Sequence, residues 1–117
     1  MRQSEKRTRN SDSKRRGRPL STLDGWMVKV GKKLEIKNRL GLHARASALL
    51  VQMISQFDAD VKISKDGLVV DGRSIMGLLT LGAPKGSKIH VEAKGKDAEE
   101  ALRAVERLIE KKFHESE

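Results

Sequence analysis

The 117-residue sequence contains no cysteine and no tyrosine, and only one tryptophan and two phenylalanines. The absence of cysteine excludes disulfides, thiolate metal sites and thiol catalysis, and is compatible with a reducing cytoplasm. So few aromatic residues do not support a platform on which nucleic-acid bases stack. No run approaches the ~18 apolar residues of a membrane span, and the basic N-terminus is not followed by the apolar stretch of a secretory signal. We therefore expect a soluble, cytoplasmic protein.

Positive charge is concentrated near the start of the chain. The formal net charge is +9, and residues 1–26 carry eight Lys/Arg against three acidic residues. This segment has almost no apolar residues with which to offset the entropy of ordering, so we expect it to be disordered. It is either an electrostatic arm for nucleic acid or acidic surfaces, or a nonessential extension, since Met27 offers a second start. We favour the extension, and predict one folded domain, residues 27–117.

Hydrophobic periodicity predicts seven secondary-structure elements in this domain. Strands are expected at 33–37, 60–64, 68–70 and 88–93, with an Asp-Gly turn between the second and third. Helices are expected from 44 to about 57, from 75 to 81 after an N-cap at Ser74, and from 98 to about 113, where Asp97 and Glu100 form a capping box. Each strand has one apolar face and each helix one apolar stripe. We therefore predict an α+β, two-layer open-faced β-sandwich of order β-α-β-β-α-β-α, with helices on one face of a four-stranded antiparallel sheet.

His43 lies where a loop is expected to become a helix, in the stretch Gly41-Leu42-His43-Ala44-Arg45. Such a position ordinarily holds Ser, Thr, Asp or Asn, and it presents backbone N–H groups and the positive end of the helix dipole to anions, phosphate above all. A neutral imidazole can attack a phosphoryl group through one nitrogen, while Arg45 and the N–H groups receive the charged oxygens. A lone histidine is more often structural, so this hypothesis depends on its context. The three histidines lack metal-ligand spacing, and we expect neither a metal nor a cofactor.

A second motif follows thirty residues after His43, in Arg73-Ser74-Ile75-Met76-Gly77-Leu78-Leu79-Thr80-Leu81-Gly82. With both motifs and the same order of elements, the chain from about Met27 to Glu117 resembles HPr, the histidine-containing phosphocarrier of the phosphoenolpyruvate-dependent phosphotransferase system. The resemblance implies that His43 accepts phosphate on Nδ1 from phosphorylated enzyme I and passes it to an enzyme IIA component, so that the protein is a carrier and not an independent enzyme. Arg45 and the backbone N–H groups of Ala44 and Arg45 would hold the phosphoryl group.

The resemblance also bears on two further residues. Ser74 aligns with a regulatory serine phosphorylated by HPr kinase/phosphorylase, although its role as an N-cap would account for it alone. Family members usually have proline where this sequence has Ala46. Proline in the first turn of a helix contributes roughly 0.4–1 kcal/mol of stability, and alanine is a good helix former, so we expect the fold to tolerate the exchange.

Apolar residues near His43 predict a docking surface for acidic partners. We expect Ile75 and Leu78 to face inward. The predicted docking residues are Leu42, Met76 and Leu79, ringed by the cations Arg45, Arg73 and Lys85, which would raise association rates at low salt. We expect a monomer. Two alternatives stay open: a nitrogen-related or purely regulatory carrier of the same family, and a nucleic-acid-binding protein that acts through its basic tail.

Overall fold

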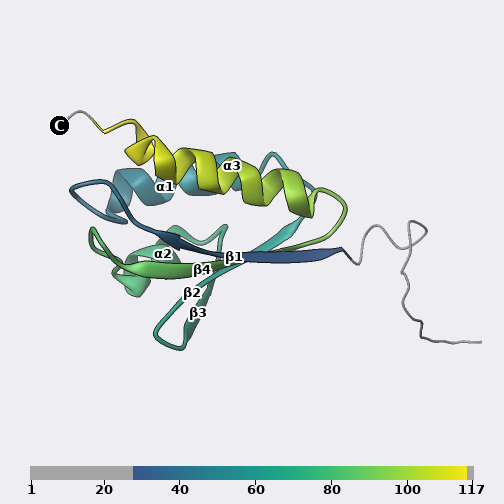
Figure 1. The fold of residues 1–117 in the computed structure, drawn as a ribbon, viewed down its shortest axis with the longest axis horizontal. Coiled ribbons are helices and arrows are strands. Elements are labelled where there is room, and N and C mark those ends of the chain that lie inside the picture. Colours follow the sequence, from purple (N-terminus) through teal and green to yellow (C-terminus); the bar gives the residue numbers. More distant parts are fainter. Residues whose placement is uncertain (1–27, 116–117) are drawn as a thin grey trace, which may run out of the picture.

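The computed structural model describes residues 28–115, and its elements follow the predicted order (Figure 1). They are β1 (Lys29–Glu35), α1 (Ala44–Ile54), β2 (Asp60–Lys65), β3 (Leu68–Asp71), α2 (Ile75–Leu81), β4 (Lys88–Lys94) and α3 (Ala98–Glu110), followed by a short 3₁₀ turn at Lys112–His114. The basic extension predicted for residues 1–26 lies outside the described residues, as does Met27.

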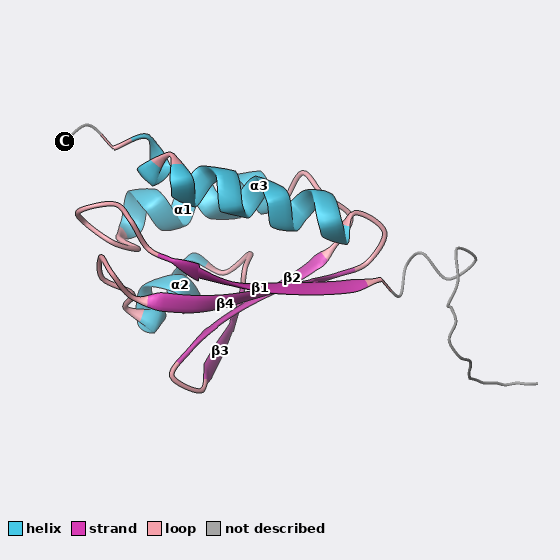
Figure 2. Cartoon of the chain, viewed as in Figure 1, coloured by secondary structure: helices cyan, strands magenta, loops and turns pink. Residues whose placement is uncertain are grey.

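The four strands form one antiparallel sheet in the order β1-β4-β2-β3. The two strand-helix-strand units, β1-α1-β2 and β3-α2-β4, therefore interleave. β4 lies between β1 and β2, and β2 lies between β3 and β4. Helices α1 and α3 lie side by side over one face of the sheet (Figure 2), and α2 packs against α1, β2 and β3. The predicted α+β fold with a four-stranded antiparallel sheet and three helices is confirmed.

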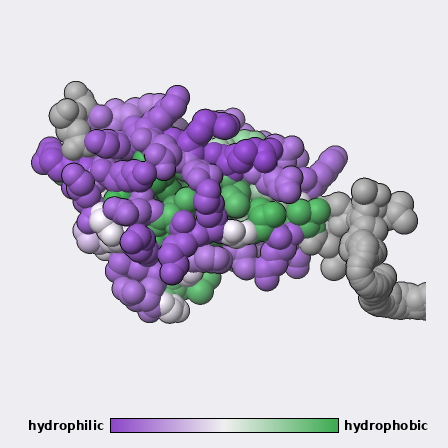
Figure 3. Space-filling view, in the orientation of Figure 1, coloured by the Kyte–Doolittle hydropathy of each residue, from purple (hydrophilic) through white to green (hydrophobic). Residues whose placement is uncertain are grey.

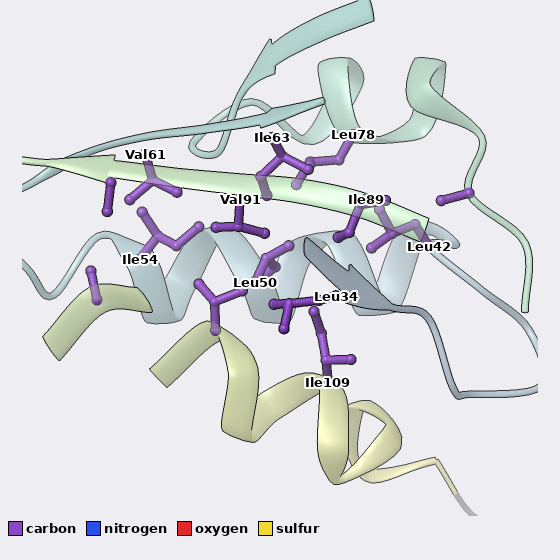
Figure 4. Close-up of a cluster of buried hydrophobic side chains, with 14 of the residues drawn as sticks. Leu34, Leu42, Leu50, Ile54, Val61, Ile63, Leu78, Ile89, Val91 and Ile109 are labelled. Carbon is purple, nitrogen blue, oxygen red and sulfur yellow. The ribbon is translucent and has the colours of Figure 1, made fainter. Parts of the chain in front are cut away.

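The core lies between the sheet and the helix pair (Figure 4). Leu50 and Ile54 of α1 and Ile109 of α3 are almost fully buried, and they face side chains of the sheet. The sheet contributes Leu34, Val61, Ile63, Ile89 and Val91. Each such side chain stabilises the fold by about 1.5–3 kcal/mol through burial. This packing fixes the position and direction of α1, and with them the place where the helix begins.

Two element boundaries differ from the prediction because backbone and charge contacts decide them. β1 spans Lys29–Glu35 instead of 33–37, because its pairing with β4 continues through polar residues that show no alternating pattern. α1 ends at Ile54 and not near Phe57. The guanidinium of Arg73 donates hydrogen bonds to the carbonyls of Ile54, Phe57 and Ala59, which occupy the end of the helix and the loop behind it.

α3 begins at Ala98 with Asp97 as its N-cap residue, as predicted, but the predicted capping box and the end of the helix were wrong. Asp97 makes no side-chain cap, and its Oδ2 accepts a hydrogen bond from the Asp58 N–H at 2.8 Å instead. The helix ends at Glu110, and Phe113 belongs to the separate turn that follows. None of the helices in residues 28–115 is long and apolar enough to cross a membrane.

Candidate functional site at the start of α1

Three loops meet at the end of the molecule where α1 begins. They are the connection from β1 to α1, the connection from α2 to β4, and the chain that follows α3 (Figure 1). The first two are joined by backbone hydrogen bonds: Leu42 N–H donates to Ala83 O at 2.9 Å, and Gly86 N–H donates to Ile36 O at 2.8 Å. The loop that precedes His43 is therefore fixed by its neighbour across the molecule.

His43 is the N-cap residue of α1, as predicted, but its side chain does not cap the helix. Its backbone is extended, and its carbonyl accepts the first helical hydrogen bond from Ser47 N–H at 2.9 Å. Within residues 28–115 no acceptor takes the N–H groups of Ala44, Arg45 or Ala46. The helix start therefore keeps three free donors beside the imidazole, and its dipole favours an anion there.

The His43 ring is hydrogen-bonded to Glu115, a residue that the sequence pattern did not indicate. His43 Nε2 lies 2.9 Å from Glu115 Oε2, and the same oxygen accepts from Asn38 Nδ2 at 2.6 Å. Glu115 Oε1 is 3.4 Å from the N–H of Leu40. The Glu115 side chain is only 7% exposed, against 28% for His43. Because 72 residues separate the two in sequence, no local periodicity or motif could have found this contact.

The carboxyl of Glu115 is held in its charged form. Burial by itself raises the pKa of this group, but hydrogen bonds from Asn38, His43 and the Leu40 N–H outweigh it, and the pKa lies below the ordinary value of 4.5. A carboxyl whose pKa is lower in the folded state than in the unfolded state stabilises the fold above its unfolded pKa. That contribution disappears as the pH falls through the lower, folded value.

This sign gives a pH prediction for Glu115→Gln, which cannot titrate. The difference in unfolding free energy between the native protein and the variant should be constant above about pH 5, and should shrink as the pH falls below 4.5. Urea unfolding at a series of pH values from about 7 to about 3 measures it. Glu110→Gln is the control, because Glu110 makes an exposed ion pair with Lys37 nearby. A difference that stays the same down to the lowest pH would contradict the stabilising role of the ionised carboxyl.

The structure places the predicted phosphate-holding groups together at the start of α1. Ala44 and Arg45 directly follow His43, and the Arg45 side chain is exposed with no partner among residues 28–115. Lys85, in the neighbouring loop, is likewise exposed. A shallow depression of about 220 Å³ lies beside the imidazole, lined by Leu40, Leu42, His43, Gly82, Ala83 and Pro84. An anion at this helix start would meet free N–H groups, and the exposed Arg45 follows His43 by two residues.

Arg73 does not belong to this cationic ring, and that part of the docking prediction is corrected. Its guanidinium donates three hydrogen bonds to carbonyls at the end of α1 and in the following loop. Since α1 has eleven residues and rises about 1.5 Å per residue, the guanidinium lies about 16 Å along the helix from His43. Arg73 is a structural clamp, and charge reversal there should first of all destabilise the fold.

Leu42 and Ile75 also lie differently from the prediction. Leu42 is 5% exposed and packs beside Ile89 in the core (Figure 4), so it cannot belong to a docking surface. Ile75 was expected to face inward but is 41% exposed. In the short helix α2 the buried residues are Leu78 and Leu81.

The exposed apolar surface near the site is made by α2 and the loop before His43. Met76 (73% exposed) and Leu79 (37%) face outward as predicted, and Leu40 (53%) joins them unpredicted. The face of the molecule seen in Figure 3 is mainly hydrophilic. Exposed apolar side chains such as these are typical of a surface that binds another protein.

Ser74 is the N-cap of α2, as predicted, and its Oγ accepts a hydrogen bond from the Gly77 N–H at 2.9 Å.

Within the described part of the chain, no three His, Asp or Glu side chains lie close enough together to hold a metal ion.

The comparisons with known proteins match the same domain. A family model described as "PTS HPr component phosphorylation site" matches residues 30–111. The chain belongs to the HPr family. It is 49% identical over 84 residues to the phosphocarrier protein HPr of Neisseria meningitidis, covering 72% of this chain and 94% of that one. It is 43% identical over 82 residues to the HPr-like protein Crh of Halalkalibacterium halodurans, covering 70% and 98%.

Solved structures of the HPr family have the same fold. The crystal structure of HPr-C-His from Thermoanaerobacter tengcongensis matches with a TM-score of 0.72 at 43% identity, covering 75% of this chain and 99% of that one. The resemblance inferred from the two motifs is thereby confirmed, and the protein shares its fold with phosphocarriers of the phosphotransferase system.

Proposed function

We propose that the protein is a cytoplasmic phosphocarrier, not an independent enzyme, which accepts a phosphoryl group on His43 from phosphorylated enzyme I and passes it to an enzyme IIA component. The observation that carries this proposal is the imidazole at the start of α1, beside the free N–H groups of Ala44 and Arg45. Nε2 is hydrogen-bonded to Glu115, so Nδ1 is the nitrogen open to a phosphoryl group. Membership of the HPr family supports the same chemistry.

The fixed groups around His43 suit phosphoryl transfer, in which a protein contributes mainly positioning and electrostatic stabilisation. The backbone N–H groups of Ala44 and Arg45 are preorganised donors for the equatorial oxygens of the transferred group, and the exposed Arg45 guanidinium adds a charged donor. None of these donors has another partner within residues 28–115. The carrier would then hold phosphate without needing a metal of its own at this position.

The partner surface we propose consists of the exposed apolar side chains Leu40, Ile75, Met76 and Leu79, together with Arg45 and Lys85. Its apolar part offers burial, and its two cations favour partners with acidic surfaces and speed their association at low salt. The revised surface differs from the predicted one by losing Leu42 and Arg73 and gaining Leu40 and Ile75.

Labelling with phosphoenolpyruvate and enzyme I tests the proposed function. The full chain should acquire one acid-labile phosphoryl group, only when enzyme I is present, and should lose it when an enzyme IIA protein is added. An absence of labelling, or a label that survives acid as a phosphoserine does, would contradict the carrier role. Discharge to a nitrogen-related IIA protein, but not to sugar-specific ones, would favour the regulatory branch of the family instead.

Ser74 is proposed as a regulatory phosphorylation site. It is partly exposed at the start of α2, directly before the apolar residues Ile75 and Met76 of the proposed partner surface. A phosphate there would add a charge of about −1.5 to −2 beside the residues of the partner surface. It would also change the hydrogen bond that the Gly77 N–H now donates to Ser74 Oγ. Incubation with ATP and an HPr kinase tests it: incorporation that is lost in Ser74→Ala supports the site, and incorporation elsewhere contradicts it.

Nucleic-acid binding is the competing function of another class. It would depend on residues 1–26, which lie outside the described residues. Salt-dependent binding that disappears when the chain starts at Met27 would favour it, whereas unchanged labelling of that shortened chain by enzyme I would show that the tail is not needed for transfer.

Ala46→Pro should leave labelling intact and raise the unfolding free energy by about 0.4–1 kcal/mol. Ala46 is the third residue of α1, and its N–H has no acceptor within residues 28–115, so proline removes no hydrogen bond there. Urea unfolding and enzyme I-dependent labelling measure the two effects. Ala48→Pro, placed inside the same helix, is the control and should destabilise by about 3 kcal/mol or more. Complete loss of labelling in Ala46→Pro would show that the site is organised around alanine.

A further inference from the structure

The contact between Glu115 and His43 is maintained at a conformational cost. Lys112, Phe113 and His114 all have left-handed backbone conformations, with φ of 55°, 54° and 60°. Such a conformation is unfavourable for a non-glycine residue, and strained backbone of this kind clusters at functional sites. Phe113 is 1% exposed and anchors the turn in the core. The turn follows α3 and leads directly to Glu115, which contacts the ring of His43.

Asn38 also holds the Glu115 carboxylate, at the same oxygen that contacts His43. It is fully buried, and both hydrogens of its Nδ2 are used, one by Gly41 O at 2.8 Å and one by Glu115 Oε2 at 2.6 Å. Its Oδ1 is buried with no partner among residues 28–115. Turning the amide over would present that oxygen to two acceptors, so this orientation is required. A buried acceptor without a donor is unfavourable, and the fold tolerates it where the amide holds Glu115.

We propose that Glu115 is a positioning residue for phosphoryl transfer: its carboxylate keeps the proton of His43 on Nε2, leaves the Nδ1 lone pair free to accept the phosphoryl group, and balances the positive charge of the phosphorylated ring. This inference deepens the proposed function and depends on it for the transfer step. A carboxylate can only accept hydrogen bonds, so the contact of 2.9 Å requires the N–H to be on Nε2. The arrangement is that of a carboxylate that orients a catalytic imidazole.

The transfer then needs no movement of that proton. The Nδ1 lone pair forms the bond to phosphorus while the bond from phosphorus to the donor's leaving atom breaks, and its electron pair stays with that atom. The ring keeps its Nε2 proton and becomes cationic. Glu115 Oε2 lies 2.9 Å from Nε2 of this charged ring. When the acceptor attacks phosphorus, the Nδ1–P bond breaks, its electron pair returns to Nδ1, and the ring is neutral again.

The ring contact is tested first on the unphosphorylated full chain by ¹⁵N–¹H NMR. We expect His43 to show a protonated Nε2, with a proton protected from exchange with water, and an unprotonated Nδ1. The protection should be lost in Glu115→Ala and kept in Glu110→Gln, the matched control whose carboxylate pairs with Lys37. A proton on Nδ1 in the native protein, or protection that survives Glu115→Ala, overturns the proposal.

The transfer step is tested by the rate of labelling with phosphorylated enzyme I. Glu115→Gln keeps the shape and one acceptor oxygen but loses the charge, so labelling should be about tenfold slower, the difference between charged and neutral hydrogen bonds. Glu115→Ala should be at least as slow, and Glu110→Gln should label at the native rate. A native rate in Glu115→Gln overturns the role of the charge. If even the native protein is not labelled, the proposed function fails, while the NMR result still decides separately whether Glu115 holds the Nε2 proton.

Discussion

His43→Ala should show no enzyme I-dependent labelling at all, because the substitution removes the atom that forms the bond to phosphorus. The fold should survive this change. The His43 side chain is 28% exposed and, within residues 28–115, makes a single hydrogen bond, to Glu115. Glu115 keeps its contacts with Asn38 and Leu40 when the ring is absent, so the loss of stability should be about 1–2 kcal/mol.

The control for this variant is His90→Ala. His90 is an exposed histidine on β4, and Lys33 of the neighbouring strand β1 is its partner in the register. The His90→Ala variant should be labelled at the native rate. Phosphate incorporation is measured before and after acid treatment, with circular dichroism to show that each variant is folded. An acid-labile phosphate that persists in His43→Ala would refute the assignment, whatever the stability of the variant.

The parts of the fold that the sequence predicted are those that local chemistry decides. The hairpin between β2 and β3 follows from its Asp-Gly turn, where both residues have positive φ, and Ser74 caps α2 through a hydrogen bond three residues away. His43 was predicted at the start of α1 for the same reason, since loop, glycine and helix are adjacent in sequence. Such features depend on backbone geometry over a few residues, and a pattern can therefore indicate them.

The parts that the sequence did not predict depend on contacts between distant segments. In the sequence, Arg73 has the pattern of a surface cation, but in the structure it donates hydrogen bonds to carbonyls in the loop after α1. Leu42 has the pattern of an exposed loop residue, but its backbone is hydrogen-bonded to Ala83 and its side chain is buried in the core. Glu115 lies in a polar stretch without periodicity, and a left-handed turn, which no propensity favours, brings it to His43. The candidate nucleophile was therefore predictable, and the residue that holds its ring was not.

Gly41 shows how closely the loop before His43 is fitted to its surroundings. Its φ is +67°, a conformation that favours glycine, and a Cβ at this position would lie 2.5 Å from Ala83 O and 2.9 Å from Pro84 Cα. Both neighbours are backbone atoms of the loop that pairs with Leu42, so neither can turn away as a side chain could. Any residue larger than glycine must separate the two loops, and His43 lies two residues further along the chain that would move.

Gly41→Ala should therefore lower the unfolding free energy by about 3 kcal/mol or more, from the left-handed backbone and the displaced loop together. Labelling by enzyme I should fall about a hundredfold, since a shift of about 1 Å in a reacting group has an effect of that size. Gly67→Ala is the matched control: its φ is +86°, but nothing lies within 4 Å of the added Cβ. It should lose about 1–2 kcal/mol from backbone strain alone and keep its labelling rate. Urea unfolding and initial labelling rates separate the two variants, and equal losses in both would mean that the contact with Ala83 does not position His43.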